Sequence, residues 1–367
     1  MDIATVGVIG AGTMGGGIAQ NLAEHGITAY VHDAAPEQVA RALDGIGSAL
    51  ARAVAKGRMD EASAAAVRAR LVPCDALDRI AGCDLVIEAV FEDLAIKQSL
   101  FQRLAPLLPP RNLVASNTSS LRIDELAGSV PHPERFLGLH YFSPAAINRL
   151  VEVVRGAATS PRNHARALEF ARASGKQPLA CRDAHGFVVN RFFCPYLNEA
   201  ARLLDDGFSI AAIDRVARDV FSAPLGPFAV MNITKPRIAL HAQRTLGKLG
   251  AFYEPARALV ETGDADRSWT IAEDAAMPDA AARDAIARRL EAAVFLPVLQ
   301  LLDESVAEPP AVDLGARVAL RWEMPPCAAM DRAGAEGVGA VLGPFLPRYA
   351  VKRPQRLACV GRLLGLA

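Results

Sequence analysis

The chain has 367 residues, about half of them apolar, and its 40 basic and 40 acidic residues leave no net charge. This length predicts two or three domains, and the composition is that of a soluble globular protein. Because there is no basic excess and no Lys/Arg run interleaved with aromatic residues, we expect no nucleic-acid partner. No uninterrupted apolar stretch is long enough to cross a bilayer, so we expect no membrane partner either.

The cysteines indicate the cellular compartment and do not form a metal-binding motif. None of the cysteines forms a C-x-x-C pair or joins a Cys/His cluster with the spacing of metal ligands. We therefore expect reduced structural thiols, no metal and a cytoplasmic location. The first apolar run leads directly into glycines from residue 10, which is not the pattern of a signal peptide. The cysteines are Cys74, Cys83, Cys181, Cys194, Cys327 and Cys359.

A glycine-rich turn follows the first predicted strand. Residues 5–9 read as a short buried strand, residues 10–15 (Gly-Ala-Gly-Thr-Met-Gly) open a helix, and residues 28–32 read as a second strand. The motif G-x-G-x-x-G is weak by itself. Between a strand and a helix, within a β-α-β unit of this size, it predicts a dinucleotide site.

Each part of this turn has a physical role in holding a dinucleotide. Gly10 permits the tight turn, Gly12 lets the backbone approach a pyrophosphate, and Gly15 lets the helix pack against the strand. The helix N-terminus, which includes Thr13 and Met14, offers N–H groups and a positive dipole to the phosphates.

Asp33 closes the second predicted strand and distinguishes between dinucleotides. Its carboxylate can accept hydrogen bonds from the adenosine ribose hydroxyls and would repel a 2′-phosphate. No arginine follows it directly, because the next residues are Ala34, Ala35 and Pro36. The sequence therefore predicts NAD rather than NADP, with FAD or an empty turn as the alternative.

Strands and helices alternate over the rest of the first 184 residues, which is typical of a Rossmann-type, parallel, doubly wound sheet. Residues 37–70 suit a helical hairpin, and a helix is expected from residue 94 to about residue 107. Strands become scarce from about residue 186, so the first domain is expected to span residues 1–184. Further strands are predicted at residues 84–90, 113–116, 136–140 and 150–154.

The C-terminal region is expected to be all-α and to contain a repeat. Residues 213–218 resemble residues 312–317 at an offset of 99, and a fainter match occurs at an offset of 98 near Arg191. A long register with one small gap favours duplication over chance similarity between Ala/Arg-rich helices. The two related helical units would be residues 185–275 and 276–367.

His140 and Glu152 are the candidate catalytic pair. His140 ends an apolar predicted strand, and Glu152 lies inside the apolar run 150–154. A carboxylate buried there needs a partner, and an imidazole one strand away can supply it. If Glu152 accepts from one ring nitrogen, the other can act as a base. This predicts alcohol oxidation, in which the base takes the hydroxyl proton while hydride passes to the nicotinamide. A structural role is the alternative.

Other polar residues are expected at the same sheet edge. Residues 117–120 (Asn-Thr-Ser-Ser) follow a strand where ligands bind in such sheets, and their hydroxyls can hold a substrate oxygen. The alternative is an N-cap for a helix expected near Ile123. Glu92 and Lys97 can contact the nicotinamide half of the cofactor, although Lys97 can instead form an exposed i,i+4 pair with Asp93.

Taken together, these motifs resemble the L-3-hydroxyacyl-CoA dehydrogenases over residues 5–233. Five separate motifs occur in order, which is much more specific than the glycine turn alone. The matching stretches are residues 8–15, 86–90, 115–120, 140–144 with 150–153, and 186–191.

The resemblance implies a role for each matching residue. His140 matches the catalytic base and Glu152 the carboxylate that orients it. Ser119 matches a serine that contacts substrate and cofactor, and Asn190 matches an asparagine near the thioester and the 3-oxygen. The remaining matches are Glu92 and Lys97 as cofactor contacts and Lys56 as a contact to the CoA phosphates, and Ser143 occupies a further cofactor-contacting position.

Two departures from the family pattern affect these expectations. Ser143 stands where the family usually has an asparagine that touches the cofactor. The second helical unit has Arg288 at the position that corresponds to Asn190, so we expect that unit to be structural.

The sequence thus predicts reversible oxidation of an (S)-3-hydroxyacyl-CoA to the 3-oxoacyl-CoA with NAD, in fatty-acid or related acyl-CoA degradation. One alternative is a dehydrogenase of a free hydroxy acid or sugar acid, as in the λ-crystallin/L-gulonate relatives. Another is an inactive cofactor-binding scaffold. The β-hydroxyacid dehydrogenases, which use a helix lysine, are disfavoured by the context of Lys97 and Lys176. We expect a homodimer, or a monomer whose two helical units mimic the dimer contact.

Overall fold

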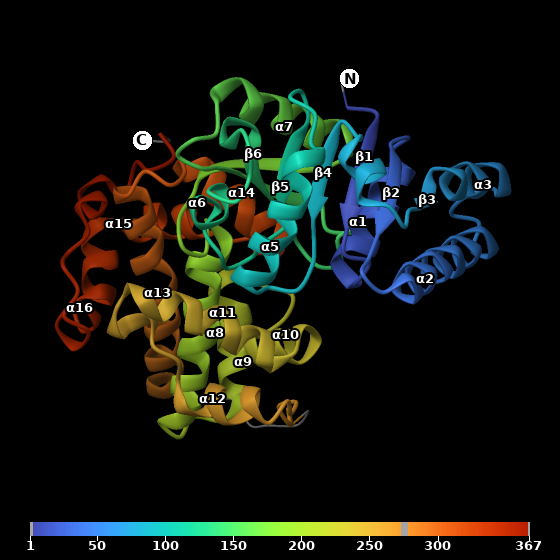
Figure 1. Cartoon of the computed structure of the whole chain (residues 1–367). Helices are drawn as coiled ribbons and strands as arrows, with labels where there is room; N and C mark the ends of the chain where they lie inside the picture. Colours follow the sequence, from blue (N-terminus) through green and yellow to red (C-terminus); the bar gives the residue numbers. More distant parts are fainter. Residues whose placement is uncertain (1–2, 273–277, 366–367) are drawn as a thin grey trace. The chain divides into compact units, whose positions relative to one another are not determined.

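The computed structural model describes residues 3–272 and 278–365, and the chain divides into two compact units, Met1–Asp183 and Ala184–Ala367 (Figure 1). The first unit is built on a sheet and the second is helical. None of the helices within the described residues is both long and apolar enough to span a membrane.

Within the described residues of the first unit, eight strands form a sheet in the order β3-β2-β1-β4-β5-β6-β7-β8. The central strands are apolar and buried on both faces, as expected for parallel strands covered by helices. The strands are β1 Thr5–Ile9, β2 Thr28–His32, β3 Leu71–Pro73, β4 Leu85–Glu88, β5 Leu113–Ser116, β6 Phe136–Tyr141, β7 Leu150–Arg155 and β8 Gln177–Arg182.

Helices connect most of these strands and cover the sheet. Helix α1 packs on β1 and β2, and the predicted hairpin over residues 37–70 is confirmed as α2 and α3, which lie side by side (Figure 1). The helices of this unit are α1 Thr13–Glu24, α2 Pro36–Ala55, α3 Glu61–Ala69, α4 Leu77–Ala81, α5 Leu94–Leu104, α6 Ile123–Ala127 and α7 Pro161–Ala173, with 3₁₀ turns η1 Ala105–Leu107 and η2 Pro133–Arg135.

The Rossmann-type sheet is confirmed, but it is not parallel throughout. β7 runs antiparallel to β6, while β8 pairs parallel to β7. The segment between β6 and β7 is short and contains no helix, whereas a parallel connection needs a crossover of roughly a dozen residues or more. Two strands were not predicted: β3 has three residues, and β8 is partly exposed. Neither shows a long apolar run or a clear alternation.

The second unit consists of helices within the described residues. Helix α8 packs along α13, and Pro195 and Pro297 lie inside these two helices. The elements are α8 Val189–Asp205, α9 Ile210–Phe221, α10 Pro227–Thr234, α11 Pro236–Leu246, η3 Gly247–Leu249, η4 Ala251–Tyr253, α12 Arg257–Asp264, α13 Ala280–Asp303, α14 Pro309–Ala319, α15 Pro326–Leu342, α16 Phe345–Arg348 and η5 Gln355–Cys359.

Two buried aspartates make matching contacts within this unit, 99 residues apart. Asp214 on α9 accepts hydrogen bonds from the first backbone N–H groups of α10, at 2.8 and 3.1 Å. Asp313 on α14 accepts from the first N–H groups of α15 at the same distances. Each carboxylate thus stabilises the start of the next helix, where N–H groups lack partners.

The same offset relates unusual backbone positions. Ser222 and Arg321, at the ends of α9 and α14, have φ angles of 47° and 58°. Lys235, between α10 and α11, has φ 81°, and Gly334, at a kink inside α15, has φ 73°. At this offset, the kink in α15 falls at the position of the break between α10 and α11. The expected boundary between the units, at residues 275 and 276, lies outside the described residues.

Candidate active site

The glycine turn lies where the strand order of the sheet reverses. β1 pairs with β2 on one side and with β4 on the other, and ligands of doubly wound sheets bind at such a point. Gly10 has φ 100°, and a Cβ there would lie 2.4 Å from the Ala89 carbonyl oxygen. A Cβ on Gly15 would lie 1.7 Å from the Gly10 oxygen. The turn and its packing therefore require glycine at both positions.

Gly12 differs from these two glycines because nothing in the protein crowds it. A Cβ built there meets no described atom within 4 Å. The absent side chain therefore leaves room outside the protein, on the side where a phosphate approaches. Gly12 is the N-cap of α1 and makes no side-chain cap, so the N–H groups of Thr13 and Met14 are oriented for an anion. This local geometry fits the pyrophosphate of a dinucleotide.

Asp33 lies beside the glycine turn, as predicted. Its Oδ2 accepts a hydrogen bond from the Ala11 N–H at 2.7 Å, and its Oδ1 accepts from the Ala35 N–H at 3.0 Å. A carboxylate offers about four acceptor positions, so Asp33 retains capacity for two ribose hydroxyls. The two backbone contacts fix the orientation of this carboxylate beside the glycine turn.

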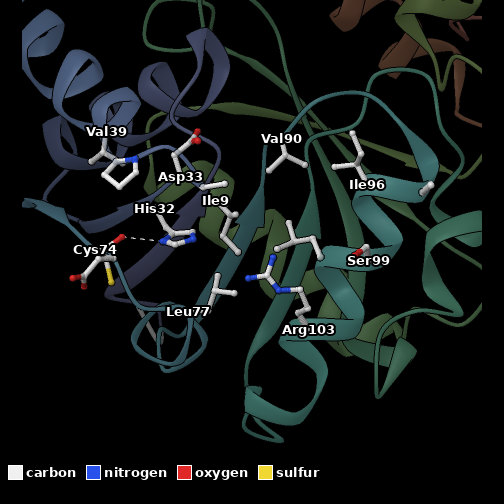
Figure 2. A pocket seen from close by; sticks show the side chains of 15 residues that line it. Ile9, His32, Asp33, Val39, Cys74, Leu77, Val90, Ile96, Ser99 and Arg103 are labelled. Carbon is white, nitrogen blue, oxygen red and sulfur yellow. Dashed lines mark hydrogen bonds between the residues drawn. The ribbon is translucent and has the colours of Figure 1, made fainter.

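A cavity of about 740 Å³ lies next to Asp33, at the carboxyl ends of β1, β2 and β4 (Figure 2). Its walls are mainly apolar, and they include Ile9, Val39 and Leu77. His32 and Arg103 add polar groups. An apolar pocket with a few polar groups, directly beyond a ribose site, fits the adenine half of NAD.

His140 and Glu152 are brought together by strand pairing. β6 and β7 place the two residues directly opposite each other, and His140 Nδ1 lies 2.6 Å from Glu152 Oε2. Glu152 is fully buried, and His140 is 5% exposed. A carboxylate accepts, so Nδ1 carries the proton and Nε2 keeps its lone pair. The ring of Phe142 lies against the imidazole, with centroids 4.5 Å apart. The pair has the geometry of an oriented general base.

Glu92 holds the polar turn that follows β5. Its Oε1 accepts hydrogen bonds from the hydroxyls of Thr118 and Ser120 at 2.6 and 2.8 Å, and from the backbone N–H of Ser119 at 2.8 Å. Burial raises the pKa of Glu92, but the Lys97 charge and these hydrogen bonds outweigh burial and lower it to about 2. Glu92 is therefore a carboxylate at neutral pH, and it fixes the turn that carries Ser119.

Capping does not explain this polar turn. α6 begins at Ile123, and the N–H groups of Ile123 and Asp124 donate to the Asp183 carboxylate at 3.0 Å each. Asp183, the last residue of the first unit, therefore caps α6. The alternative interpretation, that residues 117–120 supply the N-cap of this helix, is wrong, because Arg122 is the N-cap residue.

Lys97 is buried rather than paired on the surface. Its ammonium lies 2.5 Å from Glu88 Oε1 and 3.1 Å from Glu92 Oε2, and its side chain is 1% exposed. The alternative of an exposed pair with Asp93 is wrong, because Asp93 caps α5 through the Ile96 N–H. The positive charge of Lys97 therefore compensates the charges of two carboxylates, Glu88 at the end of β4 and Glu92 just beyond it.

A second buried lysine holds the loop that contains Ser143. Lys176 Nζ donates to the carbonyl oxygens of Ala145 and Asn148 at 2.6 and 2.7 Å. It also lies over the Tyr141 ring, 5.7 Å from the centroid. Burial lowers the pKa of Lys176 to about 8, against the opposing charge of Glu24. Ser143 itself is exposed, and the bond from Ser143 to Pro144 is cis.

The remaining predicted site residues lie in different parts of the chain. Lys56 is exposed at the C-terminal end of α2. Asn190 belongs to the second unit, where it is partly buried in the first turn of α8. Their contacts to substrate stay predictions.

Sequence reasoning missed Glu88, which is central to this site. Glu88 ends β4, is fully buried, and accepts from Lys97, from the Ser116 hydroxyl at 2.5 Å and from the Val90 N–H at 2.8 Å. The signal was present, since a glutamate closes an apolar strand and a lysine follows nine residues later. The argument that paired Glu152 with His140 would also have found Glu88 and Lys97. Lys176 gave no such signal, because its partners are backbone carbonyls.

Two family models match consecutive parts of the chain. The NAD binding domain of 3-hydroxyacyl-CoA dehydrogenase matches residues 5–184, and the C-terminal domain of the same family matches residues 186–268. These ranges meet at the boundary between the two compact units.

Curated proteins and solved structures agree with these matches. The chain is 40% identical to a probable 3-hydroxybutyryl-CoA dehydrogenase of Deinococcus radiodurans, over 62% of this chain and 81% of that protein. It is also 40% identical to the 3-hydroxyadipyl-CoA dehydrogenase of Escherichia coli K12, over 64% of this chain but only 49% of that protein. The crystal structure of an Escherichia coli 3-hydroxybutyryl-CoA dehydrogenase is similar over 99% of both chains, with a TM-score of 0.86 and 26% identity. The chain therefore belongs to the family of NAD-dependent 3-hydroxyacyl-CoA dehydrogenases.

Proposed function

We propose that this chain oxidises the hydroxyl group of an (S)-3-hydroxyacyl-CoA to a ketone with NAD, and catalyses the reverse reaction. The observation that carries the proposal is the buried pair of His140 and Glu152, which presents an imidazole with a fixed tautomer in an NAD-binding unit. The expected setting is fatty-acid or related acyl-CoA degradation.

His140 acts as the base in this reaction. Nε2 takes the proton of the 3-hydroxyl as the C–H bond at the same carbon breaks; NAD held by the glycine turn and Asp33 would supply the hydride acceptor. Glu152 keeps the proton on Nδ1 before the reaction and stabilises the imidazolium afterwards. In the reverse direction, the imidazolium returns its proton to the ketone oxygen.

Three further residues position the substrate in this proposal. Ser119 binds the 3-oxygen from a turn that Glu92 holds in place. Asn190 contacts the thioester end, and the exposed Lys56 meets the CoA phosphates. Ser143 takes the place of the usual asparagine beside the cofactor, on the loop that Lys176 fixes.

The substrate comparison that tests this proposal uses the wild-type chain. We expect (S)-3-hydroxybutyryl-CoA to support NADH formation with a far higher kcat/KM than free (S)-3-hydroxybutyrate. Binding energy from the CoA portion helps to position the reacting carbon, so the free acid should lose kcat as well as affinity. A preference for a free hydroxy acid or sugar acid would overturn the proposal in favour of that alternative.

A substrate series would then identify the acyl group. The similar proteins include enzymes named for 3-hydroxybutyryl-CoA and for the dicarboxylic 3-hydroxyadipyl-CoA. Thioesters of increasing chain length, together with a dicarboxylic one, should be compared by kcat/KM.

For the helical region, we propose that residues 185–275 and 276–367 are duplicated units that mimic a dimer contact within one chain. Support comes from the matched contacts of Asp214 and Asp313 and from the packing of α8 along α13. A sedimentation mass near 38.9 kDa would agree with a monomer, while twice that mass would favour the homodimer.

A cytoplasmic location is also proposed, since all six cysteines are free thiols.

A further inference from the structure

His32 lies in the cavity beside Asp33, and its environment fixes its tautomer. Nδ1 lies 3.0 Å from the carbonyl oxygen of Cys74. A carbonyl can only accept, so Nδ1 carries the proton and Nε2 has the lone pair. Figure 2 shows the dashed bond from His32 to Cys74, and it shows the other ring nitrogen on the side toward Ile9 and Arg103. The cavity therefore contains a fixed hydrogen-bond acceptor.

The position of His32 indicates which part of NAD it meets. His32 is the last residue of β2, and Asp33 next to it is placed for the ribose. The base of a dinucleotide bound at the glycine turn would lie beyond the ribose, between the apolar walls of this cavity. Among the edges of adenine, the 6-amino group is a donor, and it needs an acceptor such as the His32 lone pair.

We propose that His32 reads the 6-amino group of the adenine base through Nε2, and that it thereby selects adenine over hypoxanthine dinucleotides. Hypoxanthine carries a carbonyl oxygen in place of that amino group. A carbonyl oxygen facing the Nε2 lone pair loses the hydrogen bond and adds repulsion between two acceptors. The inference rests on NAD binding and not on the acyl substrate.

Other polar groups around the cavity fit this role less well. The Asp33 carboxylate already accepts from Ala11 and Ala35, and its remaining capacity is assigned to the ribose hydroxyls. Asp75 is exposed, so its carboxylate stays hydrated. Arg103 offers donors only, which the 6-amino group cannot use. His32 is half-buried and held in place by its bond to Cys74.

The test measures dissociation constants of the full chain for NADH and for reduced nicotinamide hypoxanthine dinucleotide, by titration calorimetry. We expect the wild type to bind NADH about threefold to tenfold more tightly, the usual range for one net hydrogen bond. In His32→Asn, the amide can still donate to Cys74 but does not reach the Nε2 position. In this variant, the dissociation constant for NADH should rise to match that for the hypoxanthine dinucleotide. The dissociation constant for the hypoxanthine dinucleotide itself should not rise.

The variant His32→Phe keeps a planar aromatic ring without a nitrogen acceptor and should give the same loss of preference. Asp75→Asn and Ser99→Ala, which alter other groups that line the cavity, should keep the wild-type preference. A wild type that binds both dinucleotides equally would overturn the proposal, as would His32 variants that weaken both to the same extent. Since binding is measured without the acyl substrate, this result can be interpreted even if the proposed acyl-CoA reaction is not observed.

Discussion

Replacing His140 with glutamine should lower kcat for (S)-3-hydroxyacyl-CoA oxidation by about 10²- to 10⁴-fold, which is the usual contribution of general-base catalysis. The glutamine amide can donate to Glu152, so this buried carboxylate keeps a hydrogen-bond donor. An amide cannot take the hydroxyl proton, however. NADH should still bind, because the glycine turn and Asp33 are unchanged.

A matched variant and a binding measurement make this result specific. His241→Gln makes the same change on the exposed surface of α11 and should leave kcat unaltered. NADH affinity, measured by fluorescence titration, should be the same in all three proteins. If His140→Gln kept wild-type activity, the assignment of the base would be wrong.

Replacing Lys97 with methionine should destabilise the first unit by roughly 3–5 kcal/mol, the usual cost of breaking a buried ion pair. The change leaves Glu88 fully buried and Glu92 nearby, both without the ammonium that compensates them. The loss should appear in urea unfolding followed by far-ultraviolet circular dichroism.

The chain offers two controls for this stability change. Trp269 and Trp322 are the chain's two tryptophans, and both belong to the second unit, so a separate tryptophan fluorescence transition should not move. Adding Glu88→Gln to Lys97→Met removes one of the unpaired charges and should restore part of the stability. A loss below about 1 kcal/mol, within the range of surface substitutions, would mean that this ion pair is not buried.

The sequence was sufficient to predict features that depend on local pattern. The glycine turn, Asp33 and the strands β1, β2, β4, β5, β6 and β7 follow from short runs with a clear physical reason. The pair of His140 and Glu152 also followed from one argument, that a carboxylate inside an apolar strand needs a partner. The sequence match at an offset of 99 was also visible, and the duplication that it indicates stays a proposal.

Features that depend on tertiary contacts could not be predicted in the same way. The antiparallel direction of β7 follows from the connection between two strands, whose residues give no signal of direction. Asp183 caps a helix that begins 60 residues earlier in the chain, and Lys176 binds carbonyl oxygens of a distant loop. His32 acquires its tautomer from Cys74, 42 residues away. Each of these depends on a partner that sequence proximity does not indicate.

The measurement that tests the central claim most directly is the oxidation of NADH by the purified full chain with acetoacetyl-CoA. We expect a rate that depends on both enzyme and acetoacetyl-CoA, with the (S) enantiomer of 3-hydroxybutyryl-CoA as the product. A chain that binds NADH but gives no rate with acetoacetyl-CoA or longer 3-oxoacyl-CoA thioesters would contradict the account.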